Sequence, residues 1–158
     1  MLSPNVHLEP TIYGDLQESK WTPAVYGPIQ NKIIVVEKKW GAEYILPDQK
    51  GYTTKFMSVA PGGTCSVHFH KHKNETFVLL RGKLLATYFT QEGDKIEVLL
   101  ENPLDSLVLP NCTPHTFKIP SDQEEDTWFL ESSTFDDPED SYRLTRSTSN
   151  AEETTSNR

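Results

Sequence analysis

The feature that most restricts the fold of this chain is a succession of short apolar or alternating runs, each ended by turn-forming residues. Gly, Pro, Asn and Asp separate the runs, as at Pro61-Gly62 and Asn102-Pro103, and these residues favour turns. No stretch shows the 3.6-residue apolar period of an amphipathic helix over a convincing length. Many short strands at this spacing are typical of an all-β sandwich or closed barrel. We expect strands over residues 32–37, 42–46, 52–59, 65–70, 75–81, 83–89, 95–100, 106–109, 115–118 and 127–133.

The chain of 158 residues divides into three parts by composition, and its length suits one domain. Residues 1–30 are rich in Pro, Gly and polar residues and are interpreted as an N-terminal arm. Residues 31–144 carry the strand pattern and form the predicted domain. The acidic run from Asp136 to Asp140 is predicted to be a solvated loop or the start of a helix. Residues 145–158 are polar apart from Ala151, so we predict a disordered tail.

Composition also restricts the partners and the location of the protein. A formal net charge of −8 argues against a nucleic-acid surface, which needs a basic face. No signal-peptide pattern and no apolar run of membrane-spanning length is present. We therefore expect a soluble, cytoplasmic protein without a membrane partner. Cys65 and Cys112 are expected to be reduced thiols in that compartment, with no ligand or redox role.

The histidine spacing predicts a metal site. His68 and His70 lie two residues apart on a predicted strand, so their side chains share one face. A polar turn over 71–74 would bring the carboxylate of Glu75 opposite the two imidazoles, and His115 in a second hairpin would close the set. Three imidazoles and one carboxylate suit one divalent transition metal: Zn, Mn, Fe, Ni or Co.

This pattern resembles the first motif of the cupin superfamily, G-x5-H-x-H-x4-E-x6-G. Gly62, His68, His70, Glu75 and Gly82 fill its fixed places. The second motif matches at Pro110 and His115, whereas residues other than the usual Gly, Gly and Asn stand at three places: Leu104, Cys112 and Ile119. The resemblance implies a double-stranded β-helix, the jelly-roll barrel of cupins.

Within the cupins, the chain is similar to the mannose-6-phosphate isomerase-like (type II) domain. The segments that carry this likeness are residues 39–44, 51–62 and 131–144. That branch often has Gln where His68 stands, so this site is richer in imidazole. The resemblance implies an enzyme: a metal-dependent isomerase or epimerase whose small-molecule substrate is a sugar or sugar phosphate.

Roles for individual residues follow from their places. Phe77 and Leu79 share the phase of Glu75 and are expected to wall the cavity. For proton transfer the candidates are Glu75, if only loosely ligated, a metal-bound hydroxide, and His72 at the turn. Lys55 would contact an anionic substrate if it turned inward, and would otherwise be a solvated lysine.

Two other functions stay open on the sequence alone. The same ligands serve Fe(II)-dependent dioxygenases, and a non-catalytic sugar-binding cupin would need the ion only to fix a ligand or the fold. Sheet edges must be covered in such a fold, and an aromatic N-terminal arm could cross to a neighbouring subunit. We therefore predict a homodimer.

Overall fold

The computed structural model describes residues 33–47 and 51–145. The predicted arm (1–30) and the predicted tail, apart from Thr145, lie outside the described residues. The described residues form strands and one short 3-10 helix: β1 (Ile34–Lys38), β2 (Gly41–Ile45), β3 (Tyr52–Val59), β4 (His68–Phe69), β5 (Glu75–Arg81), β6 (Leu84–Phe89), β7 (Lys95–Leu100), β8 (Ser106–Leu109), β9 (His115–Lys118), β10 (Thr127–Thr134), η1 (Pro138–Asp140) and β11 (Tyr142–Arg143). The all-β prediction is confirmed.

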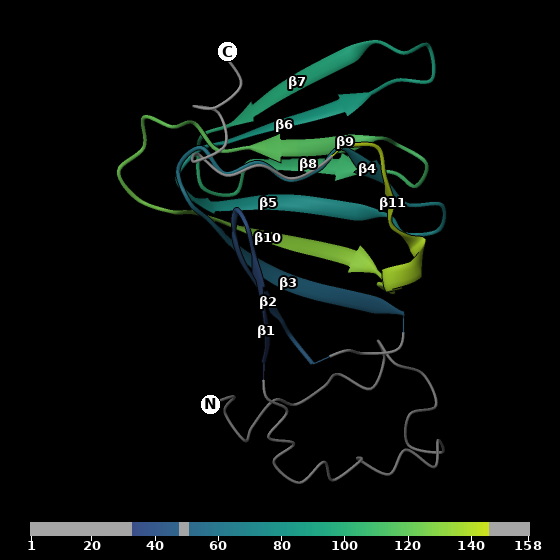
Figure 1. Ribbon diagram of the computed structural model, residues 1–158, viewed down its shortest axis with the longest axis horizontal. Coiled ribbons are helices and arrows are strands. Elements are labelled where there is room, and N and C mark those ends of the chain that lie inside the picture. The colour runs from purple at the N-terminus through teal and green to yellow at the C-terminus, as the bar shows by residue number, and fades with distance from the viewer. Residues whose placement is uncertain (1–32, 48–50, 146–158) are drawn as a thin grey trace, which may run out of the picture. The chain divides into compact units, whose positions relative to one another are not determined.

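The strands form two antiparallel sheets. The first has six strands in the order β1-β2-β3-β10-β5-β8, and the second has five in the order β11-β4-β9-β6-β7. Figure 1 shows β3, β10 and β5 as adjacent arrows in the first sheet and β9, β6 and β7 in the second. Each predicted range contains or overlaps an observed strand. The predicted strand over 65–70 is too long, because only His68–Phe69 forms a strand there.

Apolar side chains from both sheets make the core. On β5 and β10 the buried residues alternate with partly exposed ones, as expected where one face of a strand packs inward. Aromatic rings make edge-on contacts in this core: Phe129 on β10 lies 5.2 Å from Phe117 on β9, across the two sheets, and 5.2 Å from Phe77 on the neighbouring strand β5, between ring centroids. Such pairs add to the burial of the rings. Leu79, predicted to wall a cavity, is fully buried in this core.

Turn geometry is kept at the places where the second cupin motif lacks glycine. Leu104 and Cys112 adopt left-handed backbone angles, with φ of 74° and 59°. The motif glycines Gly62 and Gly82 have comparable values, 77° and 86°. A side chain in this conformation costs roughly 1–2 kcal/mol per residue. The substitutions therefore leave the turn intact.

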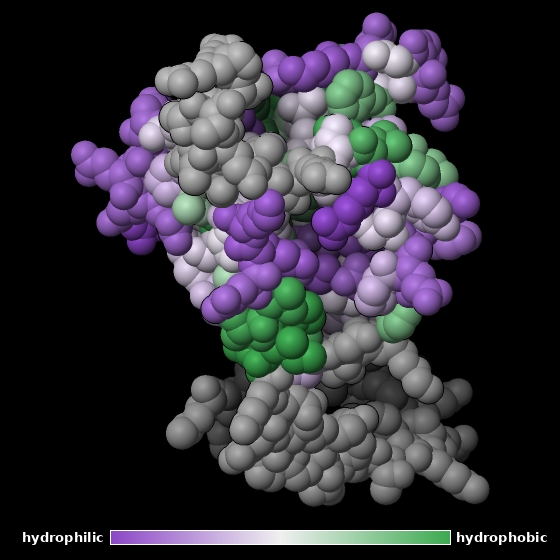
Figure 2. Space-filling view, in the orientation of Figure 1, coloured by the Kyte–Doolittle hydropathy of each residue, from purple (hydrophilic) through white to green (hydrophobic). Residues whose placement is uncertain are grey.

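Strand β1 forms one edge of the six-stranded sheet and carries apolar side chains that face solvent. Ile33, Ile34 and Val35 are each at least half exposed. Figure 2 shows a hydrophobic patch over the position of β1. Edges of this kind are normally protected, which is consistent with the predicted homodimer but does not test it. Among the described residues, no helix is long and apolar enough to cross a membrane.

Candidate metal centre

Three histidines from two neighbouring strands meet at one point. His68 on β4 is the direct register partner of His115 on β9, and His70 follows β4 immediately. The ring centroids of His68 and His115 lie 4.5 Å apart, and those of His68 and His70 lie 5.1 Å apart. One ligand atom from each of the three lies within 4.8 Å of the other two. The predicted convergence of these imidazoles is confirmed.

Backbone carbonyls fix the tautomer of all three rings. Nδ1 lies 2.8 Å from Ser66 O in His68, 2.6 Å from Asp140 O in His70 and 2.9 Å from Thr113 O in His115. A carbonyl oxygen only accepts, so each Nδ1 must carry the proton and donate it. Each neutral ring then presents a bare Nε2 lone pair, which is the form that binds a metal ion.

Nε2 of His70 and Nε2 of His115 are buried without a hydrogen-bond partner among the described residues. Burial lowers the pKa of His68 to about 4 and also lowers the pKa of His70, so both rings are neutral at neutral pH. A divalent transition metal fits this set, because it would bind buried nitrogens that make no hydrogen bond to any described residue.

Glu75, at the start of β5, places its carboxylate beside two of these rings. Oε2 lies 3.0 Å from His115 Nε2, without the angle of a hydrogen bond, and Oε1 lies 3.6 Å from His70 Nε2. Burial raises the pKa of Glu75, but the neighbouring His115 and Lys73 outweigh it, and the pKa falls below its usual range. The carboxylate is therefore ionised, although its role as a fourth ligand stays a prediction.

Lys73 is the functional residue that sequence reasoning missed. Its side chain is only 4% exposed, and its Nζ lies 2.7 Å from Glu75 Oε1, 3.1 Å from Glu131 Oε1 and 3.0 Å from Asp136 Oδ1. Burial opposes its charge, but the surrounding carboxylates raise its pKa. A lysine in a polar turn gives no signal of burial. For Glu131 the sequence does contain a signal of burial, because this residue shares the phase of the inward-facing Phe129 on β10.

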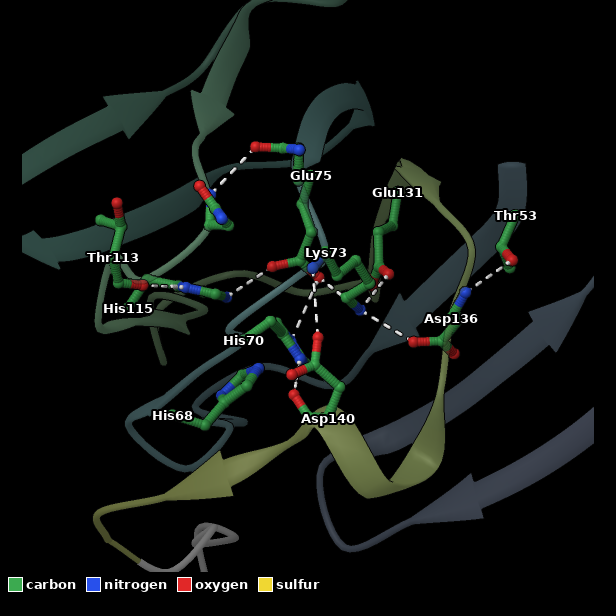
Figure 3. A network of polar contacts seen from close by, with 12 residues as sticks. Thr53, His68, His70, Lys73, Glu75, Thr113, His115, Glu131, Asp136 and Asp140 are labelled. Atoms are coloured by element: carbon green, nitrogen blue, oxygen red, sulfur yellow. Dashed lines mark hydrogen bonds and ion pairs between the residues drawn. The ribbon is translucent and has the colours of Figure 1, made fainter. Parts of the chain in front are cut away.

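Lys55 lies in the same network and is not a solvated lysine. It is buried on β3, with its Nζ 2.6 Å from Asp136 Oδ2 and 3.5 Å from Glu131 Oε1. Figure 3 shows the network beside the histidines, with Glu131 and Asp136 near Lys73. An ammonium has three N–H donors. Lys73 has three carboxylate partners among the described residues, whereas Lys55 has two.

His68, His70 and the charged network line one cavity of about 620 Å³, whereas His115 is not among its lining residues. Phe77 and Trp40 give it apolar wall, and β1, β2 and the segment after Asp136 contribute further lining residues. His72 is exposed in the turn after β4 and is not among the lining residues. Its catalytic role stays a prediction. Cys65 lines the cavity and is a buried free thiol, whereas Cys112 is an exposed one.

Curated relatives match only part of their own length. Mannose-1-phosphate guanylyltransferase of Salmonella muenchen is 26% identical over 113 residues, which are 72% of this chain and 23% of the relative. The xanthan biosynthesis protein XanB of Xanthomonas campestris pv. campestris is 28% identical over 103 residues, 65% of this chain and 18% of the relative. The chain thus spans less than a quarter of these proteins. No family model matches it.

Solved structures share the architecture at low identity. The capsular polysaccharide assembling protein CapF of Staphylococcus aureus is similar with a TM-score of 0.61 and 21% identity, over 75% of this chain and 33% of CapF. Oxalate decarboxylase of Bacillus subtilis gives a TM-score of 0.61 and 19% identity, over 75% of this chain and 33% of that protein. Together with the two antiparallel sheets, these matches show that the protein has the cupin fold, with a three-histidine candidate metal site.

Proposed function

We propose that the protein is a metal-dependent isomerase or epimerase that acts on a sugar or sugar phosphate. The observation that carries this proposal is the convergence of three imidazoles and an ionised carboxylate at one cavity, whose wall includes His68, His70 and Glu75. The cavity volume of about 620 Å³ falls in the range of small-molecule sites. The relatives support the substrate class, because their names refer to mannose 1-phosphate, xanthan and capsular polysaccharide.

His68, His70 and His115 would hold one divalent ion, which when bound supplies Lewis-acid polarisation of a substrate oxygen. Glu75 is the proposed general base. In an isomerisation it would take the proton from the hydroxyl-bearing carbon beside the carbonyl and return it to the former carbonyl carbon, while the hydroxyl proton passes to the former carbonyl oxygen. In an epimerisation the proton would return to the same carbon on its other face, and neither reaction needs an oxidant or reductant. Lys73 keeps this carboxylate anionic between turnovers.

Lys55 is the proposed substrate contact. Lys55 has two carboxylate partners among the described residues, fewer than the three N–H donors of an ammonium, and it lines the cavity. Such a donor suits a hydroxyl or phosphate oxygen of the substrate. Lys55→Met should therefore raise the KM for substrate more than it lowers kcat, once the variant is shown to fold.

The test is reconstitution of metal-stripped protein with Zn²⁺ or Mn²⁺, followed by NMR of aldose–ketose exchange in free and phosphorylated hexoses and pentoses. Exchange that is lost in Glu75→Gln and kept in Glu97→Gln, an exposed carboxylate paired with Lys95, would support the proposal. Inertness of the loaded wild type toward the whole panel would overturn it.

A second candidate is a non-catalytic sugar-binding module. The ion pair between Lys73 and Glu75, at 2.7 Å, favours it, because a carboxylate stabilised in this way is a weaker base. Thermal stabilisation of the protein by a sugar without any turnover would support this candidate. Oxygen uptake by protein loaded anaerobically with Fe²⁺ would instead identify a dioxygenase.

A further inference from the structure

Asp140 is a buried acid that the proposed reaction does not use. It ends the short helix η1 and is 7% exposed, although the run Asp136 to Asp140 was expected to be solvated or to start a helix. The run does begin a helix, since Asp137 caps η1 by accepting the Glu139 N–H. Its last member instead points into the protein. Figure 3 shows Asp140 facing His70 and the segment that leads to Lys73.

The carboxylate of Asp140 binds a whole turn. Oδ1 accepts the backbone N–H of Lys71 at 2.9 Å, and Oδ2 accepts those of His72 and Lys73 at 2.9 and 3.1 Å. Three successive N–H groups that point to one carboxylate form an anion-binding concavity. The carboxylate comes from 67 to 69 residues further along the chain, so it ties the closing segment to the turn between β4 and β5.

The backbone of the same residue holds a metal-site histidine. Asp140 O accepts the Nδ1–H of His70 at 2.6 Å, which fixes the ring with Nε2 toward the other two imidazoles. The turn that the carboxylate binds carries Lys73, and Lys73 contacts Glu75. One residue therefore restrains the ring of His70 on one side of the site and the carboxylate of Glu75 on the other.

We propose that Asp140 is a positioning residue of the metal centre: it sets the geometry of His70 and Glu75 through the turn over 71–73. The proposal rests on the metal-binding part of the proposed function. Outer residues that orient metal ligands typically change metal affinity by about 10–100-fold when they are replaced. Asp140→Ala keeps the backbone carbonyl that His70 uses and removes the three contacts to the turn. Asp140→Asn keeps the shape but turns an NH2 group toward N–H donors.

The experiment measures the affinity for Co²⁺ by competition with a chromogenic chelator, and the d–d absorption spectrum of the Co²⁺ protein. We expect both variants to bind Co²⁺ about 10–100-fold more weakly and with an altered spectrum. Glu139→Gln is the matched control: it removes the same charge one residue away, on an exposed side chain, and should match the wild type. Melting of the metal-free proteins shows whether the variants are folded at the assay temperature.

The outcomes separate this proposal from the proposed function. If wild-type protein takes up no Co²⁺, metal binding itself fails. If wild type binds and Asp140→Asn binds with the same affinity and spectrum, the positioning role is overturned. If Asp140→Asn yields no folded protein, the proposal is also overturned, because Asp140 would then determine the fold and not the site.

Discussion

The two chain segments that meet at the metal centre use different residues to make similar backbone shapes. Neither is the hairpin that the sequence predicted, because β4 and β5 lie in different sheets, and so do β8 and β9. The first segment, residues 62–82, carries His68, His70 and Glu75 and has a positive φ at Gly62 and Gly82. The second segment, residues 104–118, carries His115 and has positive φ at Leu104 and Cys112 instead. Glycine is the residue that adopts such angles without steric cost. The comparison teaches that surrounding contacts impose these turns and that the residue type sets only their cost.

Hydrogen bonds between the two segments supply those contacts. Cys112 N–H donates to His70 O at 2.6 Å, and Asn111 N–H donates to Asn74 Oδ1 at 3.0 Å. Leu104 N–H donates to Leu79 O on the first segment at 2.8 Å. Both left-handed residues of the second segment, Leu104 and Cys112, are thus hydrogen-bonded to the first. The position of His115 therefore depends on the first segment.

The largest effect is expected on removing a histidine from either segment. His115→Ala and His68→Ala should each weaken divalent metal binding by more than about 100-fold, beyond the cost of replacing an outer residue. Titration calorimetry with Zn²⁺ measures this affinity, and His115→Gln serves as a variant that fills the space. Wild-type affinity in either histidine variant would mean that the corresponding segment holds no metal.

Loss of the buried lysine of the first segment is the next largest expected effect. Lys73→Met removes the ammonium that Glu75, Glu131 and Asp136 share, and leaves Glu131 and Asp136 with Lys55. Breaking a buried ion pair in this way costs about 3–5 kcal/mol. Denaturant unfolding of the metal-free protein should show this decrease in the free energy of unfolding.

A control for the lysine lies in the same turn. Lys71 is exposed, and its ammonium lies 4.4 Å from the Tyr142 ring centroid. Such a contact is worth about 0.5–1 kcal/mol at an exposed site, so Lys71→Met should have a small effect. Equal losses for the two variants would show that the ion-pair network adds nothing to stability.

The fold was predictable because its signal is local. Turn residues and alternation place β3 and β5 at their observed bounds. Strand 65–70 was overextended, since Cys65 N–H bonds to Phe117 O outside a regular ladder. Strand β11 is only two residues long and is held by pairing with β4, so it carries no pattern of its own.

The imidazoles were predictable for a different reason than the charges around them. Histidine at alternating positions is a rare combination whose chemistry is specific to metals. A lysine or aspartate occurs everywhere on surfaces, and only tertiary contacts distinguish the buried Lys73 and Asp140 from solvated ones. Their partners lie more than 55 residues away in the chain for the contacts to Glu131 and to the 71–73 turn. Sequence spacing alone cannot show such contacts.

The two cysteines, one in each segment, differ in burial, and the buried one should make stability depend on pH. Each lies three residues before a histidine of the site, but Cys65 is buried and Cys112 is exposed. Burial raises the pKa of Cys65 from 9.0 to about 11. Between these values the unfolded chain loses the proton and the folded chain keeps it, so stability falls as pH rises above 9. At pH 10 this effect of Cys65 should lower the free energy of unfolding by about 1 kcal/mol.

Two measurements check the thiols. The free energy of unfolding should differ less between pH 8 and pH 10 for Cys65→Ala than for the wild type, because the variant lacks the buried thiol. Iodoacetamide at pH 8 should alkylate Cys112 in the folded protein and spare Cys65. Fast labelling of Cys65 would show that this side of the cavity opens readily.

The smallest expected effect tests the cost of the left-handed turns directly. Leu104 is 74% exposed, so Leu104→Gly removes strain of roughly 1–2 kcal/mol and little burial. The greater freedom of glycine in the unfolded chain offsets about 0.5–1 kcal/mol of this, which leaves a net gain of at most about 1 kcal/mol. Leu104→Ala keeps the Cβ atom and should not gain. A larger effect is expected from the reverse change in the first segment. Gly82→Ala should lower the free energy of unfolding by about 2–4 kcal/mol, because its Cβ would lie 2.5 Å from Thr127 Oγ1 at φ +86°. Denaturant midpoints of the three variants rank them, and Leu104→Gly must exceed Leu104→Ala if the fold imposes this turn on an unfavourable residue.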